Sequence, residues 1–372
     1  MKEYKKIWVA AGIVLFAAYF FTAARPIPVE TVLVPRWLNS IESDTPVYLG
    51  DRLGGENADS NSSGPSLQRI PFSLGSRFGY ISRNGLLSIN QIKKANVSLS
   101  PERWAEYEAE PDHIAIHDSN GEPVTVIETP RGYPFFLDGR TFLIGGEQTV
   151  ISAINESGEV SWTYEFPSPL TCVDSAAGFV LVGSLDGVAG LLDSRGRQVF
   201  FFEPGGSRYS VILGCAISRD GSRLALISGI DDQRFLILER FGTSASDYKV
   251  LYHEFLNDGF RRPVYITFIE NDRWVVFERM GGLGFYEISS RKSGKITLDG
   301  ELCAIDYSGG QEMVFAVISQ SENIKKLIGI RLPGRVIIES PFRSEEVFLG
   351  RMDSRLIVGG GQIMAAFDLE KH

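Results

Sequence analysis

The sequence predicts an all-β fold: a seven-bladed β-propeller, with eight blades as the competing count, preceded by one N-terminal transmembrane helix. Three observations lead to this prediction. From about residue 77 onward, short apolar runs alternate with turn-forming residues, similar hairpins recur every 37–50 residues, and residues 7–24 carry no charge. Four strands within each interval of this length are typical of a propeller blade.

Composition limits the possible classes of protein. The 372 residues are 44% hydrophobic and 22% charged, which excludes a wholly disordered chain. The formal net charge is −9 and the pI is about 5.2, so the protein is not expected to bind nucleic acid through phosphate contacts.

The N-terminal segment is predicted to cross a membrane. Residues 1–6 hold three lysines and form a short cytoplasmic end, and residues 7–24 would make a helix about 27 Å long, enough to span the hydrocarbon core. The basic flank favours an N-inside orientation, which places the rest of the chain in the periplasm or extracellular space. Either the segment is kept as a signal anchor, or it is removed after the small residues 22–24.

A tether is expected at residues 25–75, before a propeller at 76–372. Four prolines interrupt residues 26–46, and residues 50–66 are rich in Gly, Ser and Asn with almost no large apolar side chain, so they cannot build a core. Two short apolar runs, 29–34 and 67–73, are the candidates for a strand that returns to the propeller.

The clearest repeat comprises three hairpins at residues 114–127, 151–164 and 189–202. Each has a strand, an Asp or Asn, a few polar residues, a Gly and a second strand. Because Asx side chains bond the local backbone and Gly accepts positive φ, these are predicted turns. The equivalent turn residues are Asp118, Asn155 and Asp193, followed by Gly121, Gly158 and Gly196.

Counting these outer hairpins gives the number of blades. Six begin near residues 114, 151, 189, 235, 285 and 327, and a seventh begins at 363 but ends before its last strand. In a closed ring the missing strand comes from the other end of the chain, which removes an exposed sheet edge. Residues 29–34 or 67–73 are expected to supply it.

The motif Ala153-x-Asn155-x-Ser157-Gly158-Glu159-x-x-Trp162 resembles the tryptophan-docking repeat of quinoprotein-like and WD40-like β-propellers. The resemblance implies that Trp162 locks its blade to the next one. It extends in architecture over residues 76–370. Within the superfamily the chain is most similar to non-catalytic propellers that scaffold envelope complexes, including the propeller subunit of the outer-membrane protein assembly machinery.

An insertion is predicted at residues 93–112, between two strands of the repeat. Within it, Ser100-Pro101-Glu102 is a helix start with Pro at the first helical position. Trp104 and Tyr107 would then share one helical face. Aromatic residues on such a loop are candidate anchors for a partner protein.

The sequence predicts no catalytic, cofactor-binding or metal-binding residues. Cys172, Cys215 and Cys303 each fall in an innermost strand, where a small, weakly polar residue fits. His113 and His117 share a strand face, but two ligands do not make a zinc site.

The function expected from these features is that of a membrane-anchored, extracytoplasmic scaffold for an envelope or membrane protein, attached through residues 7–24. The alternative is a periplasmic propeller enzyme, either a quinone-cofactor oxidoreductase or a lyase. A third hypothesis is a sensor that signals to the cytoplasm. The predicted cytoplasmic end of six residues is too short to form an output domain for such a sensor.

Overall fold

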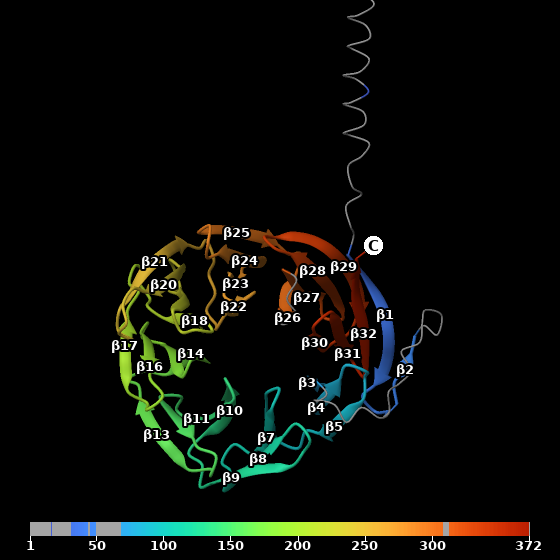
Figure 1. Cartoon of the computed structure of the whole chain (residues 1–372), viewed down its shortest axis with the longest axis horizontal. Coiled ribbons are helices and arrows are strands. Elements are labelled where there is room, and N and C mark those ends of the chain that lie inside the picture. Colours follow the sequence, from blue (N-terminus) through green and yellow to red (C-terminus); the bar gives the residue numbers. More distant parts are fainter. Residues whose placement is uncertain (1–15, 17–30, 44, 50–67, 308–311, 372) are drawn as a thin grey trace, which may run out of the picture.

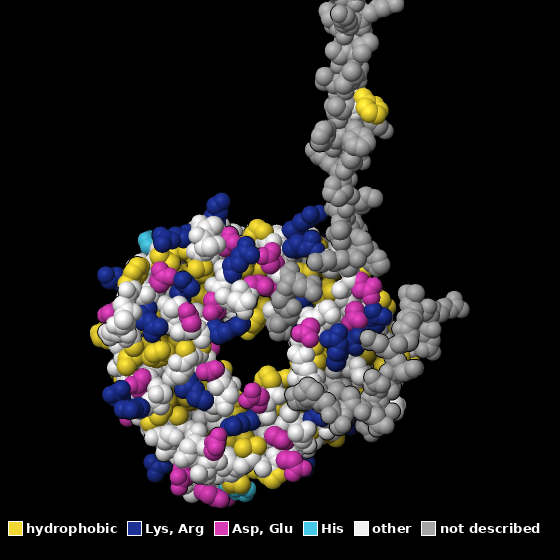
Figure 2. Space-filling model, in the orientation of Figure 1, with side chains coloured by type: hydrophobic (Ala, Val, Ile, Leu, Met, Phe, Trp, Pro, Cys, Tyr) yellow, Lys and Arg dark blue, Asp and Glu magenta, His cyan; other side chains and the backbone are white. Residues whose placement is uncertain are grey.

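The computed structural model describes residue 16 and residues 31–43, 45–49, 68–307 and 312–371. These form eight antiparallel sheets arranged as blades in a ring (Figure 1), and the space-filling view shows a channel open at its centre (Figure 2). In chain order, the strands of the blades are β3 (Arg69–Leu74), β4 (Arg77–Ser82) and β5 (Leu87–Ile92); β6 (Asn96–Leu99), β7 (Arg103–Tyr107), β8 (His113–Asp118) and β9 (Pro123–Glu128); β10 (Tyr133–Leu137), β11 (Arg140–Ile144), β12 (Val150–Ile154) and β13 (Val160–Glu165); β14 (Leu170–Ala176), β15 (Phe179–Ser184), β16 (Ala189–Leu192) and β17 (Gln198–Phe202); β18 (Ile212–Ile217), β19 (Arg223–Ser228), β20 (Arg234–Arg240) and β21 (Tyr248–Phe255); β22 (Ile266–Ile269), β23 (Trp274–Arg279), β24 (Gly282–Glu287) and β25 (Lys292–Thr297); β26 (Glu301–Asp306), β27 (Met313–Ser321), β28 (Ile324–Arg331) and β29 (Arg335–Arg343); and β30 (Val347–Met352), β31 (Arg355–Gly360), β32 (Ile363–Lys371), β1 (Thr31–Ser40) and β2 (Val47–Tyr48).

The last blade is closed by a strand from the other end of the chain. β1 pairs antiparallel with β32 from Thr31 opposite Lys371 to Ser40 opposite Ile363, and β2 adds a short outer strand. The Arg36 side chain bonds the carboxylates of Asp368, at 2.7 Å, and Glu370, at 2.5 Å. Residues 29–34 and 67–73 are the two predicted candidates for the closing strand. The first is correct, because β1 begins within residues 29–34.

The seven-blade prediction is wrong: the structure has eight blades. The blade missed by the count is the three-stranded sheet of β3, β4 and β5. Its outer turn starts at Ser82 instead of an Asp or Asn, and residues 67–73, the second candidate for ring closure, fall largely in β3. The weaker turn signal and the smaller number of strands explain the error.

The three strands correspond to the second, third and fourth strands of the other blades. Trp162 packs on Gly196 in the β16–β17 turn, which joins the third and fourth strands of its blade. Trp37 packs in the same way on Gly85 in the β4–β5 turn, so β4 and β5 are equivalent to third and fourth strands. Among the described residues, β3 is therefore the innermost strand of this blade. Pro71 lies in β3 and has no N–H to offer another strand, a common protection of open sheet edges.

Residues 93–112 are part of a regular blade and contain no helix. β6 and β7 are its two inner strands, and the expected helix start at Ser100 is the turn between them. The Ser100 hydroxyl accepts a hydrogen bond from the Arg103 N–H at 3.0 Å. Trp104 and Tyr107 consequently lie on a strand.

Arginines at the start of second strands join neighbouring blades. The second strands of several blades begin with arginine, and its guanidinium donates to the following blade. The acceptors are carbonyl oxygens or a hydroxyl: Arg69 to Ser119 O (3.4 Å), Arg103 to Thr141 Oγ1 (3.1 Å), Arg140 to Phe179 O (2.8 Å) and Arg355 to Arg83 O (3.0 Å). These bonds cross the boundaries between blades, where no backbone ladder exists.

The predicted membrane span at 7–24 lies outside the described residues, apart from Phe16. In the part of the chain that the structure covers, no helix has the length and apolar character needed to cross a bilayer.

Candidate functional site

The two faces of the ring carry different connections. Each blade is an antiparallel meander, so successive connections alternate between faces. We call the face with the links between blades, and with the turns between second and third strands, the connecting face. The β21–β22 link, the β23–β24 turn and the β25–β26 link all lie on it.

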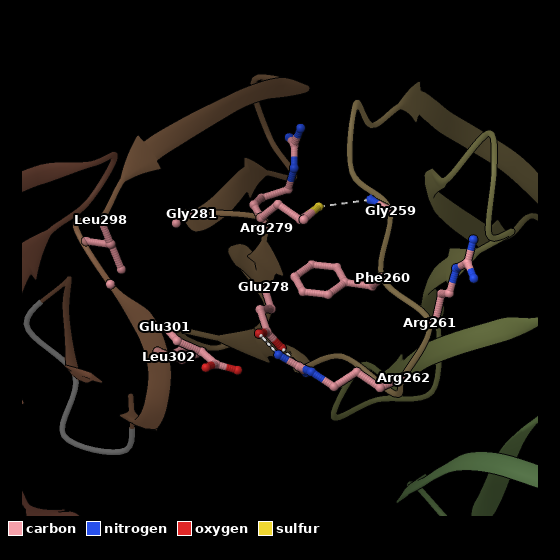
Figure 3. A pocket seen from close by; sticks show the side chains of 13 residues that line it. Gly259, Phe260, Arg261, Arg262, Glu278, Arg279, Gly281, Leu298, Glu301 and Leu302 are labelled. Carbon is pink, nitrogen blue, oxygen red and sulfur yellow. Dashed lines mark hydrogen bonds and ion pairs between the residues drawn. The ribbon is translucent and has the colours of Figure 1, made fainter. Parts of the chain in front are cut away.

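A cavity of about 600 Å³ opens where these three segments meet (Figure 3). Its walls are residues 259–262, residues 278–282, Leu298 and residues 300–302. Gly281 has a φ of +64°, which lets the chain turn tightly after Met280. The volume lies in the range of small-molecule and cofactor sites, about 300–1,000 Å³.

The floor of the cavity holds an ion pair. The Arg262 guanidinium donates two hydrogen bonds to the Glu278 carboxylate, at 3.1 and 2.6 Å, and this carboxylate also accepts from the Tyr265 N–H. The Glu278 side chain is 7% exposed and thus needs its partner. The Arg262 guanidinium also lies 4.9 Å from the centre of the Phe260 ring, which points into the cavity in Figure 3.

A second ion pair lies behind the cavity wall. Arg279 Nε donates to Asp258 Oδ2 at 2.5 Å, and Arg279 Nη1 lies 3.8 Å from Glu254. The side chains of Arg279 and Asp258 are 9% and 1% exposed. A buried charge pair of this kind holds the β21–β22 link against β23 and fixes the shape of the cavity.

The remaining carboxylate at the cavity belongs to Glu301. It makes no hydrogen bond or ion pair with another residue that the structure describes, and its charge acts on Arg262. In Figure 3 the Glu301 side chain points toward the pair formed by Arg262 and Glu278. The cavity therefore offers acceptor oxygen atoms beyond those that its own cations use.

Apolar side chains are exposed on the connecting face. Leu185 lies in the β15–β16 turn and Tyr209 in the β17–β18 link, farther round the ring from the cavity, and they are 53% and 55% exposed. Phe255, at the end of β21, is 55% exposed, and Met280 in the cavity wall is 51% exposed. Aromatic residues, Met and Arg are the types enriched in protein–protein interfaces.

A smaller cavity of about 360 Å³ lies on the opposite face, and its lining is mostly charged. Arg223 and Glu239 pair within it at 2.9 and 2.7 Å. Leu251 and Ile288 are the two apolar residues of its lining.

One carboxylate in an innermost strand has a strongly shifted pKa. Burial raises the pKa of Asp174 in β14 to about 6, although its oxygens accept hydrogen bonds from the N–H groups of Ile217 (2.9 Å) and Ser175 (2.8 Å). Because the folded pKa exceeds the ordinary value of 3.8, the stability that protonation contributes is present below pH 4 and is lost as pH rises through 6.

We therefore expect Asp174→Asn to change the pH dependence of unfolding. Between pH 4 and pH 7.5 the difference in unfolding free energy should move in favour of the variant by about 2.4 kcal/mol, at about 1.4 kcal/mol per pKa unit. The asparagine side chain of the variant has one acceptor oxygen and so loses one of the two hydrogen bonds that Asp174 accepts, which lowers stability at every pH. The test is therefore how the stability difference between the two proteins changes with pH, and not its value at a single pH. Urea titrations at several pH values test it, and parallel curves for the two proteins would contradict it.

Trp104 and Tyr107, the predicted partner anchors, do not form an exposed aromatic pair. Trp104 is 5% exposed, stacks on His117 with ring centres 4.4 Å apart, and packs against Phe78. Tyr107 is half-buried against a different core cluster, which contains Ala105 and Ile114. The helical face that would have presented both rings does not exist, and Trp104 instead fills the space between two blades.

The predicted turn residues all lie between third and fourth strands. The Oδ1 atoms of Asp118, Asn155 and Asp193 each accept hydrogen bonds from two backbone N–H groups, at 2.8–3.0 Å. Their glycines have positive φ, of +89° at Gly121, +83° at Gly158 and +73° at Gly196.

Trp162 docks on the next blade through its indole. Its Nε1 donates to Ser194 O at 3.1 Å, and its ring covers Gly196 so closely that a Cβ there would lie 2.5 Å from it. Trp37, which sequence reasoning missed, makes the same contact: Nε1 donates to Arg83 O at 3.0 Å and the ring covers Gly85. Trp162 pairs with Ala153 and Trp37 pairs with Ala366.

The cysteines lie in the innermost strands β14, β18 and β26. Cys172 packs against the core cluster that contains Cys215, and Cys303 is exposed. In the described ranges, no three His, Cys, Asp or Glu side chains are placed to hold a metal ion.

Comparisons with known proteins agree with this architecture. A relative from Treponema pallidum (strain Nichols), named as an uncharacterized protein, is 24% identical over 370 residues, which are 99% of this chain and 95% of the relative. Among solved structures, BamB from Moraxella catarrhalis has 12% identity and a TM-score of 0.57, with 91% of this chain and 100% of that chain covered. The computationally designed Ika8 protein has 13% identity and a TM-score of 0.60, with 82% and 95% covered.

These likenesses to solved structures show the fold alone. A family described as beta-propeller protein has a model that matches residues 1–371, almost the whole sequence. The chain therefore belongs to this beta-propeller protein family.

Proposed function

We propose that this chain is a membrane-anchored, non-catalytic propeller that holds a partner protein outside the cytoplasm on its connecting face. The observation that carries the proposal is the cavity between β23 and β26, with Met280 exposed in its wall and with Phe255 and Tyr209 exposed on the same face. Rigid blades fix these loops in space, so binding would order few additional groups.

The membrane attachment is part of this proposal and rests on the sequence. Residues 7–24 are uncharged and follow three lysines, as in a signal anchor with its N-terminus inside. The likeness to BamB, at 12% identity, concerns the propeller fold alone, and this fold supplies the rigid rim of loops that a scaffold needs. An envelope or membrane protein is the expected partner.

Photo-crosslinking in intact cells tests the partner and the face together. A photoreactive amino acid is placed at Tyr209, Phe255 or Met280, and in matched controls at Val160 (55% exposed) or Phe241 (60% exposed), which adjoin turns of the opposite face. Adducts of one defined size are expected from the connecting face alone. No adduct from any position, or equal adducts from both faces, would contradict the proposal.

The location is tested separately by adding protease to cells whose outer layers have been opened. The propeller should be degraded while cytoplasmic proteins stay intact. Protection of the propeller until the inner membrane is lysed would place it on the wrong side for this function.

A further inference from the structure

We propose that the cavity on the connecting face binds a basic side chain, lysine or arginine, carried by an extended apolar segment of the partner. This inference rests on the proposed function and names the chemistry of the partner. It follows from which charges of the cavity are satisfied within the protein and which are not.

The arginine side chains of the cavity lining are already paired with carboxylates or point away from the cavity. Arg262 is bound by both oxygens of Glu278, and Arg279 is bound by the buried Asp258. Figure 3 shows the Arg261 side chain pointing away from the cavity, on the far side of the β21–β22 link. An acidic ligand would therefore compete with Glu278 and Asp258 for these two guanidinium groups.

Acceptor oxygens, in contrast, are in excess. Glu301 adds a carboxylate near Arg262 without a hydrogen bond or ion pair of its own among the described residues. With Glu278 already paired to Arg262, the floor has one net negative charge. A ligand cation placed there gains a charge-assisted hydrogen bond to the exposed Glu301 carboxylate.

The rest of the cavity suits an alkyl stem. The Phe260 ring and the side chains of Leu298, Leu302 and Met280 give apolar walls, and the long methylene chain of lysine or arginine packs well on such surfaces. Gly259 and Gly281 leave the space open, since no atom lies within 3.9 Å of a Cβ built at Gly259 and none within 4 Å at Gly281. A lysine or arginine side chain therefore matches the apolar walls with its methylene groups and the Glu301 carboxylate with its charged end.

Direct binding tests the charge preference. The full-length protein in detergent is titrated with three capped pentapeptides that carry lysine, norleucine or glutamate at the centre of one apolar sequence. Calorimetry should give the order lysine, norleucine, glutamate, with at least a tenfold separation between the first and last. Equal affinities, or tighter binding of the glutamate peptide, would overturn the inference.

Variants locate the binding. Glu301→Gln removes the charge and should weaken the lysine peptide about tenfold while the norleucine peptide binds unchanged. Gly259→Leu fills the cavity and should weaken both peptides, whereas Gly146→Leu, at another open glycine of the same face, should weaken neither. Unchanged thermal unfolding of the Glu301→Gln protein shows that folding is intact.

The outcomes separate this inference from the proposed function. If crosslinks form at Tyr209 and Phe255 but Glu301→Gln and Gly259→Leu leave peptide binding unchanged, the scaffold stands and the basic side chain does not enter this cavity. If neither crosslinks nor peptide binding are found, both proposals fail.

Discussion

Replacing Trp37 by alanine should destabilise the propeller by about 3–5 kcal/mol, the range for truncating a fully buried aromatic side chain. Trp37 is 1% exposed and lies in the core cluster where the first and last parts of the chain meet. The substitution also removes the hydrogen bond to Arg83 O and the cover of Gly85, so the contact that joins the closing blade to the three-stranded blade is lost.

Urea unfolding of the full-length protein in detergent measures the loss. Leu38→Ala is the matched control on the same strand, where the side chain is 38% exposed, and should cost less than about 1 kcal/mol. Trp162→Ala should fall between the two, because Trp162 is half-buried. A loss at Trp37 no larger than that at Leu38 would show that the indole does not hold the ring closed.

Replacing Arg279 by methionine should cost about 3–5 kcal/mol, because removing one partner of a buried ion pair leaves an uncompensated charge. The Asp258 side chain is 1% exposed and would keep its carboxylate without the guanidinium bound at 2.5 Å. The β21–β22 link would loosen, and the cavity beside it would change shape.

Two further variants distinguish this charge effect from lost packing. Adding Asp258→Asn to Arg279→Met should restore part of the stability, since the amide carries no charge. Arg273→Met, which removes an arginine that is 50% exposed and paired with Glu287 at 2.9 Å, should cost less than about 1 kcal/mol. Thermal unfolding of the variants in parallel compares their losses of stability. Equal losses for Arg279→Met and Arg273→Met would contradict the predicted effect of the buried charge.

The sequence predicted the kind of fold because its hairpins are local. Asp118, Asn155 and Asp193 bond N–H groups two and four residues ahead, so the signal lies within a few residues of each turn. The blade count failed where this local signal was weaker, at Ser82, and where a strand was taken for tether.

Features that depend on distant residues could not be predicted in this way. The docking pair formed by Ala153 and Trp162 lies within one hairpin, but its counterpart is divided between Ala366 near one end of the chain and Trp37 near the other. The cavity is likewise built from three connections and the strand ends beside them, and none of these segments carries a site motif of its own. Only their placement on one face brings Phe260, Glu278 and Glu301 together.

Ring closure also sets an order of events during synthesis. β1 leaves the ribosome first, yet its partner β32 is made about 320 residues later. At translation speeds of about 5–20 residues per second, β1 waits roughly 15–65 s for its mate. During that time the nascent chain carries an unmatched apolar strand, so a folding helper or rapid docking on a provisional surface would protect it from aggregation.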